Sequence, residues 1–288
     1  MGLMSQHGRL ASRRGTAALW ADAPHESLSA LALAGVIVAS VLGGGINAIA
    51  GGGTLLTFPA LVGLGVPPLV ANATSTVALW PGAVGSMWGY RGELGGARAW
   101  VVRLTLPSLA GGAVGALLLL RTPPDDFARV VPFLVLGATL LFLVQGRLMR
   151  RLQRRRVPFG GAPGPGGDDP RFVPLYLAAQ FAIGVYGGYF GAGVGILMLA
   201  GLGLMGFINI HRMNGLKNWG GLCMNAVAAG IFAFSHIVDW PVALTMGAGG
   251  LLGGYAGSRL AQRVGQQRVR HAIVAIGIAS FLFLLRPF

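Results

Sequence analysis

Lys217 is the residue whose position most clearly suggests chemistry, because it is the single lysine among 22 cationic residues in a chain of 288. It lies about one helical turn inside the apolar run 213–235, where an ionisable group is costly to bury and therefore points to a function. Asn218 and Asn225 lie on or near the same helical face. An ammonium group beside amides suits an anion. The alternative is that the lysine side chain extends to a nearby membrane–water interface.

Two glycine clusters interrupt the apolar sequence, and each precedes a short apolar run: Gly51-Gly52-Gly53 before 54–65, and Gly191-Ala192-Gly193 before 194–208. A helix over 54–65 would rise only about 18 Å, against about 30 Å of hydrocarbon in a bilayer. Glycine adopts backbone conformations that other residues avoid, so the clusters predict helix breaks rather than packing notches. A break exposes a helix N-terminus, whose free N–H groups and positive dipole end favour an anion.

Uncharged polar residues within or at the ends of apolar segments are further candidates. Their ordinary role would be hydrogen bonding between helices, worth about 0.6 kcal/mol on average. Because Asn47 lies beside the first glycine cluster, we favour a functional role for it. The predicted substrate-binding residues are Asn47, Gly51, Gly52, Gly53, Thr54, Thr74, Ser75, Gly191, Gly193, Asn214, Lys217 and Asn218.

The acidic residues all lie in tails, loops or segment ends: Asp22, Glu26, Glu93, Asp125, Asp126, Asp168, Asp169 and Asp239. Cation transporters usually need a buried carboxylate, so this pattern favours an anion as substrate. The sequence has neither an H-E-x-x-H pair nor a G-x-S-x-G elbow. Its one cysteine, Cys223, excludes a disulfide framework and a cysteine-based metal site. We therefore expect no enzyme activity, no metal and no cofactor.

The elements that position these residues are predicted to be helices in a membrane. Hydrophobic residues make up 54% of the chain and charged residues 10%, against about 25% charged in soluble domains. The mean hydropathy is +0.67, and a soluble protein of this size needs more charge to cover its surface. Six of the apolar runs are clearly long enough to cross a bilayer and three more are near that length. The fold class expected is an all-α polytopic membrane protein.

The chain also matches itself at a separation of about 140 residues. Gly51 corresponds to Gly191, and Trp100 corresponds to Trp240. Two homologous repeats of four to five helical segments are therefore predicted, each with a short helix behind a glycine break. The predicted divisions are a polar tail (1–27), a first membrane repeat (28–146), a basic, Gly/Pro-rich cytoplasmic linker (147–171) and a second membrane repeat (172–288).

The number of crossings in each repeat leaves two topologies open. If each short run counts as a segment, each repeat has five and the two repeats are inverted. If the segment before a glycine cluster and the short run behind it together count as one crossing, each repeat has four crossings and the repeats are parallel. The arginine-rich linker should stay in the cytoplasm. The inverted scheme then places slightly more of the cationic residues inside, so we favour it.

These motifs, in order, resemble the sulfite exporter TauE/SafE family of membrane permeases over about residues 30–285. The resemblance rests on the stretch 45–61, then Gly65-Val66-Pro67-Pro68 and Ala71-Asn72-Ala73-Thr74-Ser75. In the second half it rests on residues 186–195, Asn214-Gly215-Leu216-Lys217 and Val238-Asp239-Trp240. The resemblance implies a multi-pass inner-membrane permease for small sulfur-containing anions or organic acids, such as sulfite, sulfonates and sulfoacetate.

The hypothesis is therefore a secondary permease that works by alternating access around a site between two broken helices. Its expected partners are the small anionic substrate and the lipid bilayer, with a homodimer as one assembly to consider and no nucleic acid. The alternative is a membrane assembly or signalling protein without transport activity.

Overall fold

The computed structural model describes residues 30–154, 173–205, 207, 209–261 and 266–285, and every regular element among them is helical. The first half comprises α2 (Ala30–Ala50), α3 (Thr54–Gly63), α4 (Pro68–Tyr90), the 3-10 helix η1 (Arg91–Leu94), α5 (Arg98–Arg121) and α6 (Pro124–Arg154). The second half comprises α7 (Val173–Tyr189), α8 (Val194–Leu204), α9 (Ile210–Ala233), α10 (Trp240–Ala261) and α11 (Gln266–Leu284). The predicted tail and most of the predicted linker lie outside the described residues.

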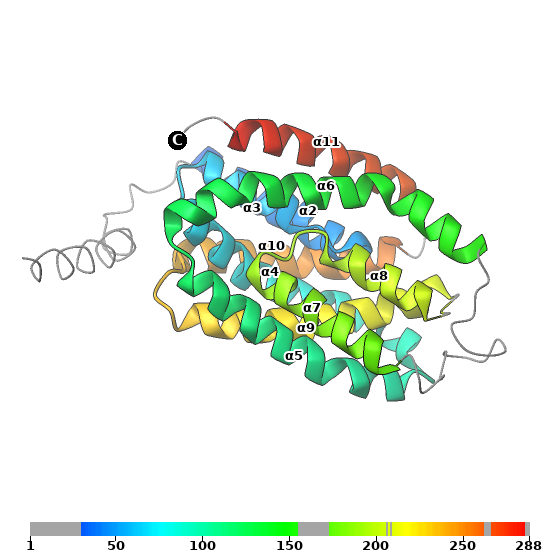
Figure 1. Ribbon diagram of the computed structural model, residues 1–288. Coiled ribbons are helices and arrows are strands. Elements are labelled where there is room, and N and C mark those ends of the chain that lie inside the picture. Colours follow the sequence, from blue (N-terminus) through cyan, green and yellow to red (C-terminus); the bar gives the residue numbers. More distant parts are fainter. Residues whose placement is uncertain (1–29, 155–172, 206, 208, 262–265, 286–288) are drawn as a thin grey trace, which may run out of the picture.

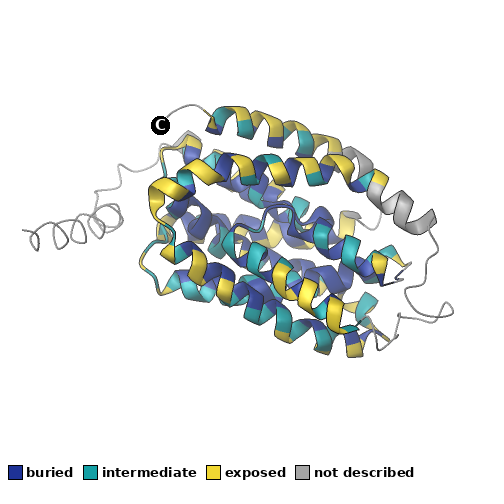
Figure 2. Cartoon of the chain, in the orientation of Figure 1, coloured by how far each residue is buried: buried dark blue, intermediate teal, exposed yellow. Residues whose placement is uncertain are grey.

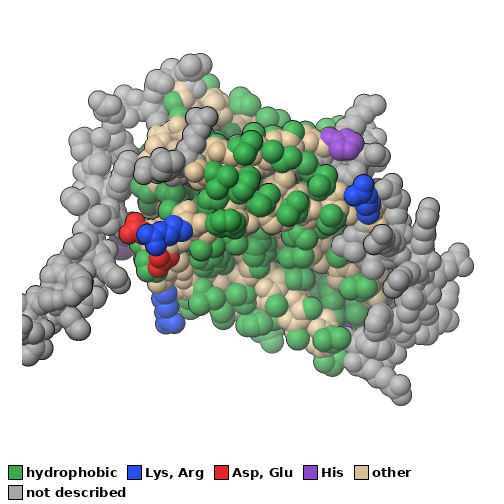
Figure 3. All heavy atoms as spheres, turned by 45° about the horizontal axis from the view of Figure 1, so that its top comes forward, with side chains coloured by type: hydrophobic (Ala, Val, Ile, Leu, Met, Phe, Trp, Pro, Cys, Tyr) green, Lys and Arg blue, Asp and Glu red, His purple; other side chains and the backbone are tan. Residues whose placement is uncertain are grey.

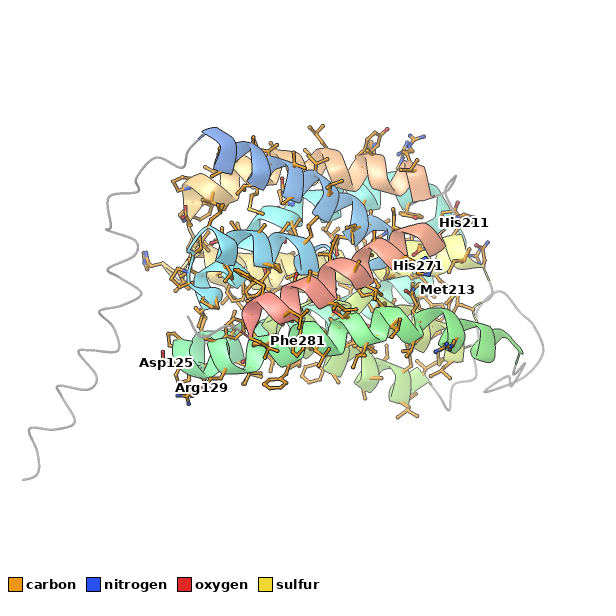
Figure 4. The ribbon with its side chains drawn as sticks, turned by 90° about the horizontal axis from the view of Figure 1, so that it is seen from above. Asp125, Arg129, His211, Met213, His271 and Phe281 are labelled. Carbon is orange, nitrogen blue, oxygen red and sulfur yellow. The ribbon has the colours of Figure 1, made fainter. Side chains whose placement is uncertain are left out.

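The long helices lie side by side as a bundle with two distinct ends (Figure 1). At the end on the left of Figure 1, α2 begins and α11 ends; we call this the terminal end. At the opposite end, α6 ends and α7 begins; we call this the linker end. Asp125 and Arg129 lie at the terminal end, whereas His211 and His271 lie toward the linker end (Figure 4). Charged side chains thus gather at the ends of the bundle.

The two short helices fold back over the helices that precede them. Gly43 of α2 lies against Thr57 of α3, and a Cβ on Gly53 would lie 3.0 Å from Asn47 Cβ, so α3 runs back along α2. In the same way Gly201 of α8 lies against the ring of Tyr176 at the start of α7. The helices have 10 and 11 residues, or about 15 Å of rise. Neither short helix continues the direction of the preceding helix, so α2 with α3 and α7 with α8 do not each form a single crossing.

Glycines allow the long helices to approach closely. α10 packs against α2 and α4, whereas α5 packs against α7 and α9. A Cβ on Gly253 of α10 would meet the carbonyl of Val41, and a Cβ on Gly111 of α5 would meet the carbonyl of Phe181. Close backbone contact between small residues is how helices associate in lipid, where no hydrophobic force drives them together.

The outside of the bundle is apolar. Leu106 is 74% exposed, Leu244 69% and Phe133 65%. Exposed residues follow the outer helices (Figure 2), and the space-filling view shows hydrophobic side chains across the described part of the visible face (Figure 3). Contiguous exposed apolar surface of this kind suits contact with lipid.

Fewer helices than expected qualify as membrane spans by length and hydropathy alone. Among the described residues three do: Ala32–Ala50, Arg98–Arg121 and Pro124–Arg147. This number falls below the six expected from length because buried polar side chains lower the mean hydropathy of a helix without preventing it from crossing within a bundle. α9, for example, buries Asn214, Lys217 and Asn218 against other helices, so its mean hydropathy understates how well it fits within a bundle.

Candidate functional site

The two glycine clusters meet in the middle of the bundle. Gly51, Gly191 and Gly193 have φ of 74°, 79° and 75°, in the left-handed region that glycine adopts at no steric cost. The Gly193 N–H donates to the Gly51 carbonyl at 3.1 Å. A Cβ on Gly51 would lie 2.5 Å from Gly195 Cα, so the backbones touch and neither position accepts a larger residue without movement.

Lys217 joins α9 to the end of α2. Its Nζ donates to the carbonyl oxygens of Ala48 at 2.9 Å and Asn47 at 3.4 Å, and Asn218 Nδ2 donates to Ala48 at 3.4 Å. The last carbonyls of a helix have no partner within it and carry the negative end of its dipole. Lys217 therefore caps α2, and with 2% of its surface exposed it does not extend to an interface.

A small cavity lies beside this contact, with a volume of about 20 Å³ open to water-sized molecules, enough for about one water. Its walls come from α2, the first break, α4, α8 and α9. The lining residues are Asn47, Gly51, Ala83, Val194, Gly195, Met198, Lys217, Asn218, Gly221 and Asn225. Carboxylates are absent from this lining. Its positive groups are the Lys217 ammonium and the N-terminal turn of α8, which begins at Val194.

The structure brings together four of the predicted binding residues at this cavity: Asn47, Gly51, Lys217 and Asn218. Gly52 instead lies against the ring of Phe142, Gly53 lies against Asn47, and Gly193 lies against Ala138. These glycines shape the breaks, and their predicted contact with substrate stays a prediction.

The other predicted residues lie away from the cavity. Thr74 Oγ1 accepts a hydrogen bond from the Asp239 N–H at 3.0 Å, and Ser75 Oγ pairs with Thr57 Oγ1 at 2.5 Å. Both therefore hold helices together, the ordinary role named above. Thr54 is the first residue of α3, and the Gly191 carbonyl accepts from Val194 N–H at 3.3 Å. The buried Oδ1 of Asn214 has no hydrogen-bond partner.

Sequence reasoning left several cavity residues out of the predicted set: Ala83, Val194, Gly195, Met198, Gly221 and Asn225. Asn225 carried a signal, since it shares a helical face with Lys217. Gly195 carried one too, because it follows the second glycine cluster by two residues. Met198, Ala83 and Gly221 look like ordinary packing residues, and only the packing of α4, α8 and α9 around the break places them here.

Histidine, cysteine and acidic side chains form no group of three within the described part of the chain that could hold a metal ion. The candidate site is thus made of amides, backbone and one ammonium group.

A helical bundle with an apolar exterior and a buried polar cavity between broken helices is the architecture of a membrane transporter. The family model of the sulfite exporter TauE/SafE matches residues 36–284. The chain belongs to this family of membrane permeases.

Curated relatives agree with this class. A probable membrane transporter protein, ORF9, of Sinorhizobium sp is 31% identical over 255 residues, which cover 88% of this chain and 92% of the relative. The probable membrane transporter protein YfcA of Escherichia coli K12 is 30% identical, with 90% and 91% covered. One from Haemophilus influenzae is 29% identical, with 82% and 87% covered. These names do not favour the assembly or signalling alternative.

Proposed function

We propose that this protein is a secondary permease for a small anion, and that the anion binds in the cavity between the two glycine breaks. The observation that carries the proposal is the burial of the Lys217 ammonium in a cavity whose lining has no carboxylate. A buried charge is costly without a counter-charge, and in this conformation only carbonyl dipoles of α2 face it. An anion would supply the missing negative charge.

The rest of the cavity also suits an anion. Val194 and Gly195 place the N-terminal turn of α8, the positive end of its dipole, in the lining, and Asn47, Asn218 and Asn225 bring amide groups to it. In this conformation the cavity holds about one water, so an anion can bind only when the walls move apart, and a small anion requires the least movement. Together with the family, this supports a sulfur oxyanion or small organic acid, such as sulfite, a sulfonate or sulfoacetate.

Alternating access around this site is supported by an exchange of contacts between the halves. α5 of the first half packs on α7 of the second, and α10 of the second half packs on α2 of the first. The contacts correspond residue by residue: Gly111 contacts Phe181, and Gly253 contacts Val41. Gly253 follows Gly111, and Phe181 follows Val41, by about the separation of the sequence repeat. We infer two repeats related by a pseudo-twofold axis, with the cavity between them.

The direction of the helices favours inverted repeats. Because α2 begins at the terminal end and α6 ends at the linker end (Figure 1), each half makes an odd number of net passages. Arg98, Arg103 and Arg147 belong to helix ends on the linker side, whereas Asp125 and Asp126 begin α6 at the terminal end. The positive-inside rule then places the linker end in the cytoplasm, in keeping with an inner-membrane location. A homodimer stays a prediction.

Flux through the purified protein tests the proposal. Proteoliposomes containing the full chain are expected to take up radiolabelled sulfite faster than protein-free liposomes, with competition by unlabelled sulfonates but not by sodium or potassium ions. Proteoliposomes that take up none of sulfite, sulfonates or small organic acids, although the protein is inserted, would contradict the proposed function.

A further inference from the structure

The described residues contain five buried side-chain atoms without a hydrogen-bond partner, and three of them lie where α5 packs against α7: Trp100 Nε1, Tyr176 Oη and Gln180 Oε1. Trp100 and Tyr176 pack edge to face with ring centroids 5.6 Å apart. Gln180 lies one turn beyond Tyr176 on α7 and donates through Nε2 to Ser108 Oγ at 3.0 Å. These four residues, which we call the α5–α7 polar column, are at most 5% exposed.

The partnerless atoms call for an explanation, because buried polar groups in proteins nearly always have a partner or an ordered water. Exchanging the oxygen and nitrogen of the Gln180 amide would not remove the deficit, since one of the two atoms would still lack a partner. In lipid such a deficit is costly unless the group lines a water-filled space. Water or a polar solute that reached the column would supply the missing partners.

The column begins at the linker end. Trp100 lies in the first turn of α5 and Tyr176 in the first turn of α7. The Arg103 guanidinium lies over the Trp100 ring, 5.3 Å from its centroid. A cationic mouth of this kind concentrates anions from solution.

The column ends beside the cavity. A Cβ on Gly220 of α9 would lie 3.3 Å from both Gln180 Nε2 and Ser108 Oγ, and it would also meet Met198 Cε. Met198 and the next residue on α9, Gly221, line the cavity. One methionine side chain therefore separates the column from the candidate anion site, and methionine changes rotamer easily.

The corresponding interface, between α2 and α10, has no such column among the described residues. Ser40 of α2, which matches Gln180 in the repeat, donates to its own helix at Ile37 O, 2.8 Å away. A Cβ on Gly249 of α10 would meet Ser40 Oγ. Helices α2 and α10 thus close over Ser40 without leaving a polar atom there unpartnered.

From these contacts we propose that the α5–α7 polar column is the cytoplasmic branch of the substrate path, through which water and the anion reach the cavity, and that Met198 separates the two. The proposal rests on the proposed function for the identity of the solute. The neutral N–H and O–H donors of Trp100, Tyr176 and Ser108 suit an oxyanion in transit, because they bind it without holding it as a fixed charge would.

Cysteine labelling provides a matched test, because Ser108 and Ser40 are both serines that are 0% exposed. The variants Ser108→Cys and Ser40→Cys would be made in a Cys223→Ser background. The membrane-impermeant anionic reagent sulfonatoethyl methanethiosulfonate would be added to inside-out and to right-side-out vesicles. We expect Ser108→Cys to react from the cytoplasmic side about 100-fold faster than Ser40→Cys, because a closed site reacts only after local opening and a hydrated site does not need to open.

Equal labelling rates for the two variants, or labelling of Ser108→Cys only from the opposite side, would overturn the proposed path.

Gln180→Met gives a second measurement, since it keeps the side-chain volume and removes the polar end. Its sulfite uptake rate should fall about tenfold, as expected for the loss of one hydrogen bond to an anion, whereas its equilibrium affinity should not change. Unchanged uptake would also count against the path. Labelling of Ser108→Cys in a protein that transports no anion would leave the path standing and remove the proposed function.

Discussion

At the scale of single residues, Lys217 does more than the sequence indicated. Its ammonium holds the Ala48 and Asn47 carbonyls at the end of α2, so it connects an element of each half while it lines the cavity. An anion that enters would compete with these carbonyls for the same three N–H donors. The proposed binding of an anion would therefore be linked through one side chain to the contact between the halves.

Substitutions of Lys217 test its proposed role in binding the anion. Lys217→Ala and Lys217→Gln should each weaken sulfite binding about 10- to 100-fold, the range expected for a charge-assisted hydrogen bond of about 1.5–3 kcal/mol. Lys217→Arg should be partly active, because a planar fork does not replace a compact ammonium in a space this small. Uptake normalised to inserted protein measures the effect. Full activity of both the Arg and Gln variants would remove Lys217 from the site.

A second residue-scale prediction concerns Gly52, where a Cβ would lie 2.7 Å from Phe142 Cε2. Gly52→Leu should abolish uptake while leaving membrane insertion largely intact, since the hydropathy barely changes. Because the obstruction is a ring and not backbone, Gly52→Leu combined with Phe142→Ala should recover part of the activity. Normal uptake by well-expressed Gly52→Leu would show that the shape of the break is unimportant.

At the scale of elements, glycine contacts decide which helices pair. Gly111 lies against the backbone of α7, whereas Gly137 on α6 has no atom within 4 Å of where its Cβ would be. The two positions therefore form a matched pair for the same substitution, one at a closely packed helix interface and one in open space.

Gly111→Leu should destabilise the bundle by about 1–3 kcal/mol, the usual cost of overpacking, and Gly137→Leu should have little effect. The melting temperatures of the two variants are compared by heating each in detergent micelles and measuring the remaining folded protein by size-exclusion chromatography. Equal melting temperatures for the two variants would mean that the α5–α7 contact does not limit stability.

The sequence was sufficient to predict the helical class, whereas the glycine breaks and Lys217 as parts of a binding site stay predictions. It was not sufficient to show that α3 and α8 turn back, because hydropathy carries no direction. It also placed Thr74 and Ser75 at the site, although their hydroxyls pair with Asp239 N–H and Thr57. Which partner a buried hydroxyl finds depends on contacts more than 15 residues away in the chain, and periodicity does not contain them.

At the scale of the whole molecule, the exchanged contacts join the two halves. α2 packs against α10 and α5 against α7, so neither half folds its own helices into a separate unit. A movement that opens the cavity to one side, as the proposed function requires, would have to slide these glycine-rich interfaces together.

Sidedness is the prediction that belongs to this scale. In a Cys223→Ser background, Asp125→Cys at the terminal end should be labelled by an impermeant maleimide from the outside, and His211→Cys from the cytoplasm. Both native side chains are exposed, so access does not depend on opening. Labelling of both positions from the same side would contradict the inverted arrangement.

The central claim is that an anion binds beside Lys217, and a structure determined with selenite tests it most directly. Selenite has the charge and shape of sulfite, and the anomalous scattering of selenium locates it. The account predicts a selenium peak in the cavity, with an oxygen about 3 Å from Lys217 Nζ. It also predicts loss of this peak in Lys217→Ala. A selenium peak elsewhere in the bundle, or one that persists in the alanine variant, would contradict it.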